Sequence, residues 1–159
     1  KTISYKEKDV LLKIIGNVFT HMNLKLDSVN QSFLSLPMGI FQIKLEGFKR
    51  VNVLVMRNAI NQINLRNTIR FKFDLKGSML AEVLSQNFDK SLVAGLTVDN
   101  VLKDNDLRSM LSYFPNLVNL KFDDRMKIVK RLQSDADFLE RLKLMDYSLL
   151  LAIEESHSD

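Results

Sequence analysis

The five residues from Asp74 to Ser78, with the sequence DLKGS, combine groups that could bind a phosphate. Their Lys-Gly-Ser portion offers an ammonium group, backbone N–H groups and a hydroxyl, all of which donate to phosphate oxygens. The segment is not a P-loop, because the first glycine of the pattern GxxxxGKS/T is missing. An aspartate and a glycine at a strand end also form ordinary turns. The residues alone therefore leave a phosphate site and a simple turn both open.

A second segment, Leu144 to Leu151 with the sequence LMDYSLLL, places one carboxylate, Asp146, between apolar flanks. A carboxylate in such surroundings is costly unless it is paired or needed for chemistry. A catalytic base that accepts a hydroxyl proton is often held between a helix and the following strand. A helix N-cap or a salt-bridged turn would explain the same residue, so both interpretations stay open at this point.

Hydrophobic periodicity predicts the elements that must position these segments. Residues 5–22 repeat apolar side chains at helical spacing and predict an amphipathic helix. Residues 38–45 and 51–56 predict two antiparallel strands, joined by a turn at Glu46-Gly47. Residues 23–31 are polar and predict a loop.

The second half of the chain is predicted to be mostly helical. Before it, residues 68–74 alternate strictly, which predicts a strand with one buried face composed of Ile69, Phe71 and Phe73. Residues 123–144 predict a long helix with acidic residues at its start and basic residues near its end. Its predicted apolar stripe consists of Met126, Val129, Leu132, Ala136, Leu139 and Leu142. Residues 145–153 predict a loop that leads into a short apolar strand, and residues 85–95 support no assignment.

This order of elements predicts an α+β fold, with an antiparallel sheet in the first half and flanking helices. The chain has 159 residues, which is enough for one domain or for a piece of a larger one. It contains no repeats or Gly/Ser linkers that would indicate a domain boundary.

Composition excludes several classes of protein. With no cysteine the chain has no disulfides and no thiolate zinc site, and two histidines make a histidine-rich metal centre improbable. Residues 1–74 carry 12 basic and 5 acidic side chains and a formal charge of +7, whereas residues 75–159 carry 11 and 14 and a charge of −3. This polarity suits an anionic partner, although two ordinary solvated surfaces would also explain it. No recognition-helix or RNA-binding signature accompanies the charge, so nucleic acid is not an expected partner.

The two segments, in this order and separation, resemble the phosphatidylinositol phosphate kinase family. In that family the strings DLKGS and MDYSLL are signatures, and both occur here without a mismatch. Four further segments resemble family segments in register: Lys1–Ser4, Phe33–Phe41, Val55–Asn58 and Leu102–Leu107. The resemblance covers residues 1–153 and implies a partial kinase-like core of the type shared with SAICAR synthase.

By position, the resemblance implies a nucleotide side and an acceptor side. Lys1 matches the lysine that contacts the nucleotide phosphates, and Glu7 or Asp9 on the next helix would pair with it, with Glu7 preferred by register. The hinge whose backbone meets adenine matches Met56, Arg57 and Asn58.

On the acceptor side, Asp146 matches the catalytic aspartate that orients the attacking inositol hydroxyl and takes its proton. Lys76 matches a lysine at the phosphate-bearing end of the active site. The implied activity is that of a phosphatidylinositol phosphate kinase, with the phosphatidylinositol-4-phosphate 5-kinase type preferred and the choice between the 4-phosphate and 5-phosphate lipids left open. ATP would be the donor, Mg²⁺ the metal, and a phosphoinositide at the cytoplasmic face of an anionic membrane the acceptor.

Departures from the family pattern keep an alternative open. Glu82 stands where an arginine is usual, and Ala152-Ile153-Glu154 replaces Gly-Ile-His. A kinase-derived interaction module without activity would tolerate both changes. On the resemblance, the glycine-rich strands would precede Lys1 and the metal-binding aspartate would follow Asp159. The chain is then expected to be a central fragment, with residues 1–74 on the nucleotide side and residues 75–159 around the catalytic loop, and with little activity alone.

Overall fold

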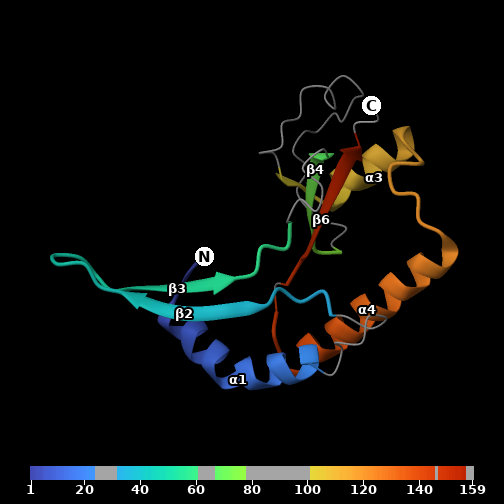
Figure 1. The fold of residues 1–159 in the computed structure, drawn as a ribbon. Coiled ribbons are helices and arrows are strands. Elements are labelled where there is room, and N and C mark those ends of the chain that lie inside the picture. Colours follow the sequence, from blue (N-terminus) through green and yellow to red (C-terminus); the bar gives the residue numbers. More distant parts are fainter. Residues whose placement is uncertain (24–31, 61–66, 78–100, 146, 157–159) are drawn as a thin grey trace. The chain divides into compact units, whose positions relative to one another are not determined.

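A computed structural model describes residues 1–23, 32–60, 67–77, 101–145 and 147–156 (Figure 1). The chain forms two compact units, each built from two segments. The first unit contains Lys1–Ala59 and Lys121–Met145, and the second contains Ile60–Leu120 and Asp146–Asp159. The described residues form three helices and two three-stranded sheets, so the predicted α+β class is confirmed and the expectation of one sheet is wrong.

The sheet of the first unit has the strand order β1-β3-β2, and both of its pairs are antiparallel. Its strands are β1 (Thr2–Ile3), β2 (Pro37–Ile43) and β3 (Val51–Met56). The predicted hairpin is therefore confirmed, including its turn. Gly47 has a φ of +78°, a conformation that favours glycine, and the N–H of Phe48 donates to the carbonyl oxygen of Leu45 at 3.1 Å.

Two helices complete the first unit: α1 (Tyr5–Asn23) and α4 (Phe122–Arg141). The predicted helix at residues 5–22 is confirmed, and the predicted helix at residues 123–144 ends earlier, at Arg141. Its apolar stripe needs correction, because Met126 and Val129 are 39% and 50% exposed. Within the described part of the chain, the buried residues of α4 are Asp135 and Phe138. The buried face of this helix therefore includes a polar side chain, which a search for apolar periodicity does not detect.

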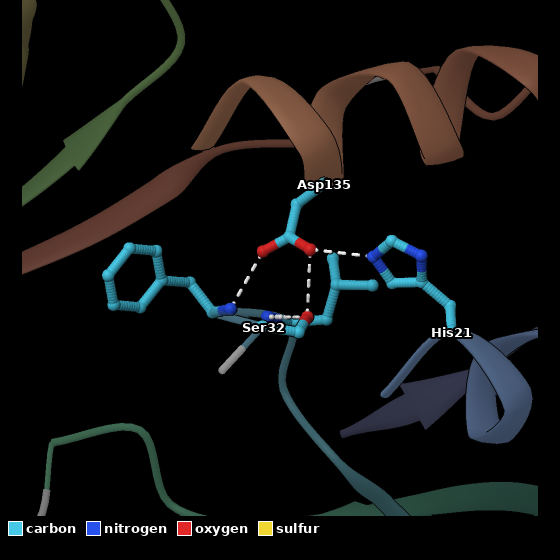
Figure 2. A network of polar contacts seen from close by, with 5 residues as sticks. His21, Ser32 and Asp135 are labelled. Carbon is cyan, nitrogen blue, oxygen red and sulfur yellow. Dashed lines mark hydrogen bonds and ion pairs between the residues drawn. The ribbon is translucent and has the colours of Figure 1, made fainter. Parts of the chain in front are cut away.

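Asp135 joins α4 to the end of α1 through a buried polar network (Figure 2). Its carboxylate accepts hydrogen bonds from Nε2 of His21 at 2.8 Å, from the Ser32 hydroxyl at 2.9 Å and from the Phe33 N–H at 2.7 Å. The His21 ring also stacks on the Phe138 ring, with centroids 4.1 Å apart. The carboxylate therefore has three donors that compensate for its burial.

The sheet of the second unit has the order β5-β4-β6. Strand β4 (Asn67–Leu75) runs antiparallel to β6 (Leu149–Ser156) and parallel to β5 (Val101–Leu102). The expectation of a purely antiparallel sheet is therefore wrong for this unit. Ile69, Phe71 and Phe73 are all buried, as predicted. The expectation that they share one face is wrong for Ile69, because the strand register shifts between Ile69 and Phe71.

Helix α3 (Asp104–Tyr113) packs against this sheet and was not predicted. It has ten residues and a polar first turn, so its apolar repeat is too short to stand out. The core of the unit consists of Phe71, Phe73, Leu102 and Met110. Residues 85–95 and most of the loop predicted at residues 23–31 lie outside the described residues. No described helix has the length and apolar character needed to cross a membrane.

Candidate functional site

Asp74, at the end of strand β4, brings three separate segments of the chain together. Its carboxylate accepts a hydrogen bond from Nζ of Lys103 at 2.7 Å. That bond, a second one from the Ser148 side chain and the charges of Lys103 and Lys76 hold the pKa of Asp74 below its usual value. Strand register adds a further link, since Asp74 lies opposite Leu150 on β6. The first residues of DLKGS and the last residues of MDYSLL are thus neighbours in one sheet.

Asp104, the first residue of helix α3, binds the turn that follows β4. One of its carboxylate oxygens accepts from the N–H of Lys76 at 3.0 Å, and the other accepts from the N–H of Gly77 at 2.8 Å. These bonds, foremost the one from Lys76, lower the pKa of Asp104, and the charge of Arg108 contributes in the same direction. Gly77 has a φ of +72°, a conformation that favours glycine in this turn.

This contact changes the interpretation of the Lys-Gly-Ser turn. The sequence left open whether the backbone N–H groups of Lys76 and Gly77 bind a phosphate or form a simple turn, and in the structure both donate to Asp104. Ser78 lies outside the described residues. The group of the described part of this turn that could meet a phosphate is therefore the side chain of Lys76, which is exposed.

The segment Leu102–Leu107, which spans the start of α3, resembles a family segment, but no role was predicted for its charged side chains. Lys103 binds Asp74 and Asp104 binds the Lys76–Gly77 turn. Asp106 is fully buried, and its carboxylate accepts from the N–H of Lys103 at 2.8 Å at the start of the helix. Lys103 is the N-cap residue of α3, and Asp106 lies three positions after it. An acidic residue at that position is typical of a helix cap. That spacing was the available signal for both α3 and Asp106.

Asp146, the predicted catalytic aspartate, lies outside the described residues. Its neighbours on the carboxyl side are described: Ser148 bonds to Asp74, and Leu149 lies opposite Leu75. The structure therefore fixes the chain two residues beyond Asp146, while the role of Asp146 stays a prediction.

The predicted nucleotide-side residues belong to the first unit. Lys1 lies beside strand β3. Its main-chain nitrogen donates to the Leu54 carbonyl oxygen at 3.1 Å, and its carbonyl oxygen accepts from the Leu54 N–H at 2.9 Å. Its side chain is exposed. Lys1 is therefore paired with Leu54, which lies two residues before Met56 at the end of β3.

Glu7 has a structural role at the start of α1. Its Oε2 accepts from the N–H of Ser4 at 2.7 Å, and the Ser4 hydroxyl oxygen accepts from the Glu7 N–H at 3.1 Å, which is a capping box. The Ser4 bonds lower the pKa of Glu7, with a smaller contribution from the charge of Lys1. No ion pair joins Lys1 to Glu7 in the described part of the first unit, and Asp9 lies 3.8 Å from Nζ of Lys8.

The predicted hinge, Met56 to Asn58, lies where the first segment of unit one approaches its end at Ala59. All three hinge residues are exposed. The N–H of Arg57 donates to the carbonyl oxygen of Leu36 at 2.8 Å, so this N–H is already used within the unit.

The described residues supply no preformed cluster of metal ligands. Among them no group of three or more histidine or acidic side chains could hold a metal ion. The acidic groups near the Lys76 turn, those of Asp74, Asp104 and Asp106, all accept from protein donors. No chemical step is therefore assigned to a metal held by these residues.

Comparison with known sequences places the chain in a family. Residues 1–159 match the family described as Phosphatidylinositol-4-phosphate 5-Kinase. Phosphatidylinositol 5-phosphate 4-kinase type-2 alpha of Homo sapiens is 34% identical over 162 residues, covering 96% of this chain and 36% of that protein. The type-2 gamma protein of Danio rerio is 33% identical over 155 residues, covering 98% and 33%. The Sus scrofa type-2 alpha protein is 31% identical over 157 residues, covering 98% and 34%.

The chain belongs to the phosphatidylinositol phosphate kinase family, and the resemblance based on its two signature segments is confirmed. It spans about a third of the length of the curated relatives it matches.

Proposed function

We propose that this chain forms part of the catalytic core of an ATP-dependent phosphatidylinositol phosphate kinase. The observation that carries the proposal is the contact of Asp74 with both Lys103 and Ser148. Three segments that resemble the family, DLKGS, LKDND and MDYSLL, meet at this one carboxylate. A lipid kinase needs positioned charges rather than covalent chemistry, and this cluster supplies charged groups on a paired sheet.

On the acceptor side, Asp146 orients the inositol hydroxyl and accepts its proton as the phosphoryl group is transferred. Lys76 neutralises negative charge at the phosphate-bearing end of the site. Asp104 accepts from the backbone N–H groups of the turn that carries Lys76, so the backbone from which the Lys76 side chain extends is held in place. Asp104 acts here as a positioning residue.

On the nucleotide side, Lys1 binds the ATP phosphates and the backbone of Met56 to Asn58 meets adenine. Because the Arg57 N–H donates to Leu36, the adenine contacts fall to the other backbone groups of this segment. Glu7 would pair with Lys1 from its place at the start of α1, where its Oε2 accepts from the Ser4 N–H. Mg²⁺ enters this proposal through the family alone, and it would neutralise phosphate charge.

The acceptor lipid is a narrower proposal. The description of the family names phosphatidylinositol 4-phosphate and a 5-kinase, which is the type we propose, acting at the cytoplasmic face of membranes. The similar curated proteins are named as 4-kinases of phosphatidylinositol 5-phosphate. Parallel assays of the full-length protein with the two lipids decide between these types.

A second candidate function is a kinase-derived module without activity. The departures at Glu82 and at Ala152-Ile153-Glu154 favour it. Titration of the full-length protein with Mg²⁺–ATP distinguishes the two functions, because a module without catalysis has no need to bind the nucleotide.

The decisive experiment measures lipid phosphorylation by the full-length protein and two variants. Lys1→Met removes the phosphate-binding ammonium group, and Asp146→Asn removes the base. We expect each to reduce turnover by about 100-fold or more. Lys127→Met removes an exposed lysine of α4 and serves as the control that keeps normal turnover. Near-normal turnover of Lys1→Met or Asp146→Asn would show that the assigned role is wrong.

A further inference from the structure

The loop that joins β2 to β3 exposes two large apolar side chains at its end. We refer to residues 44–50 as the hairpin tip. Leu45 is 62% exposed and Phe48 is 75% exposed. The two lie on either side of the turn, which is closed by the bond from the Phe48 N–H to the Leu45 carbonyl oxygen. Figure 1 shows this loop projecting well beyond β1 and α1 of the same unit.

Cations surround these apolar side chains. Lys44, Lys49 and Arg50 are all exposed, and Glu46 is the single acidic residue of the hairpin tip, which therefore carries a formal charge of +2. Long basic side chains keep their charges in water or at phosphates while their stems lie along an apolar surface. The tip thus combines an apolar end with a positively charged border.

The apolar surface continues along one face of the hairpin. Ile43 lies opposite Val51, and Phe41 lies opposite Val53, so these four side chains share a face. Phe41, Ile43 and Val51 are 56%, 48% and 42% exposed. The opposite face is the one that is buried in the unit, since it carries Asn52 and Leu54.

We propose that the hairpin tip inserts Leu45 and Phe48 into the interfacial region of an anionic membrane, with Lys44, Lys49 and Arg50 at the lipid headgroups. Two side chains at the end of a narrow projection, bordered by cations, match the combination of apolar burial and attraction to anionic lipids that holds peripheral proteins at membranes. This proposal deepens the proposed function, since a lipid kinase must reach its substrate at a membrane. It adds the element that makes the contact.

The chain has no tryptophan, so a single one can report the environment of any chosen residue. Phe48→Trp places the reporter at the tip. Phe122→Trp is the matched control, because Phe122 is 74% exposed in the same unit, at the start of α4. The 159-residue chain is mixed with vesicles of phosphatidylcholine alone or of phosphatidylcholine with phosphatidylserine, and brominated lipids are used as quenchers.

We expect Phe48→Trp emission to move to shorter wavelength and to be quenched with the anionic vesicles only, while Phe122→Trp emission is unchanged. Leu45→Ser combined with Phe48→Ser should lower the vesicle partition constant on the order of 100-fold. Replacing Lys44, Lys49 and Arg50 by glutamine should lower it by a similar factor, about 100-fold.

Three results would overturn the proposal. The first is unchanged Phe48→Trp emission with anionic vesicles. The second is equal quenching of the two reporters, which would indicate adsorption without a preferred element. The third is Phe48→Trp emission that is already at short wavelength without lipid, which would mean that protein covers the tip. If that emission depends on protein concentration, the covering protein is a second copy of the chain.

The vesicle experiment uses no ATP and no lipid substrate, so its outcome is independent of catalysis. Loss of the proposed kinase activity would leave the vesicle result intact. Failure of the vesicle test would leave the nucleotide and lipid-phosphorylation tests of the proposed function intact.

Discussion

Lys103 donates a hydrogen bond from its ammonium group to the carboxylate of Asp74 at 2.7 Å, and this contact joins the start of helix α3 to the end of strand β4. Both side chains are partly exposed, at 34% and 26%. Asp74 also bonds to Ser148, so the pair forms the centre of a small polar cluster in the second unit. A charge-assisted bond in this setting should contribute more to stability than an ion pair on the open surface.

The first prediction concerns this pair. Lys103→Met keeps the apolar stem and removes the charge, and we expect it to lower the free energy of unfolding by about 1–2 kcal/mol. Lys127→Met is the control, because Lys127 lies 3.4 Å from Asp124 with both side chains more than half exposed. Its effect should stay below about 0.5 kcal/mol. Urea titration followed by circular dichroism measures both, and equal effects would show that the Asp74 pair adds nothing.

The second prediction concerns pH and Asp104. Backbone N–H groups, first that of Lys76, lower the pKa of Asp104 in the folded state, so the unfolded state binds more protons in the acid range. The stabilisation is complete above the unfolded pKa of about 3.9 and is lost as pH falls through the lower, folded pKa. The pKa of Asp74 is lowered too, and its contribution has the same sign.

We therefore expect the urea midpoint to fall as the pH decreases from about 5 to about 3. Asp104→Asn should have a lower midpoint at neutral pH and a shallower acid decline. The measurement is a series of urea titrations of the two proteins across this range. An acid decline of the same slope in Asp104→Asn would show that other groups cause it.

The parts of the fold that the sequence predicted are those governed by local repeats. Phe71 and Phe73 alternate with polar residues, and both are buried in the core of the second unit. The hairpin at Glu46-Gly47 was predicted because glycine favours the positive φ that this turn needs. Each of these features depends on residues that are close together in the chain.

The parts that were missed depend on residues far apart. Asp104 lies 28 positions after Lys76, and no local pattern indicates that its carboxylate would accept the backbone N–H groups of the Lys-Gly-Ser turn. Asp135 lies 114 positions after His21, and it is one of the two buried residues of α4, where an apolar stripe was expected. Tertiary structure selects such polar partners, and their spacing in the sequence carries no period.

The third prediction uses two glycines whose added Cβ would meet no atom within 4 Å. Gly77 has a φ of +72° at the turn bound by Asp104, so Gly77→Ala should lower the free energy of unfolding by about 1–2 kcal/mol. Gly16 lies inside helix α1, where Gly16→Ala should instead raise it by about 0.5–1 kcal/mol. Urea titration gives the sign for each variant, and two changes of the same sign would contradict the backbone assignment of one of them.

The last prediction concerns the network of Asp135, which is 5% exposed and accepts from His21, Ser32 and Phe33 (Figure 2). Asp135→Ala leaves three donors without their acceptor, and we expect it to lower the free energy of unfolding by about 3 kcal/mol. Asp135→Asn keeps one acceptor oxygen at the same position, so its loss should be smaller.

Asp137 provides the matched control for Asp135→Ala. It is an exposed aspartate two residues after Asp135 on the same helix, and its carboxylate accepts from Gln133 at 2.8 Å. Asp137→Ala should change the free energy of unfolding by no more than about 0.5 kcal/mol. Urea titrations of the three variants, followed by the helical circular dichroism signal, rank them as Asp135→Ala, Asp135→Asn and Asp137→Ala in decreasing order of loss. If Asp135→Ala and Asp137→Ala cost the same, the buried carboxylate does not hold α4 to α1. An Asp135→Asn loss as large as that of Asp135→Ala would instead show that one oxygen is not enough. His21, Ser32 and Phe33 would then need both anionic oxygens of the carboxylate as acceptors.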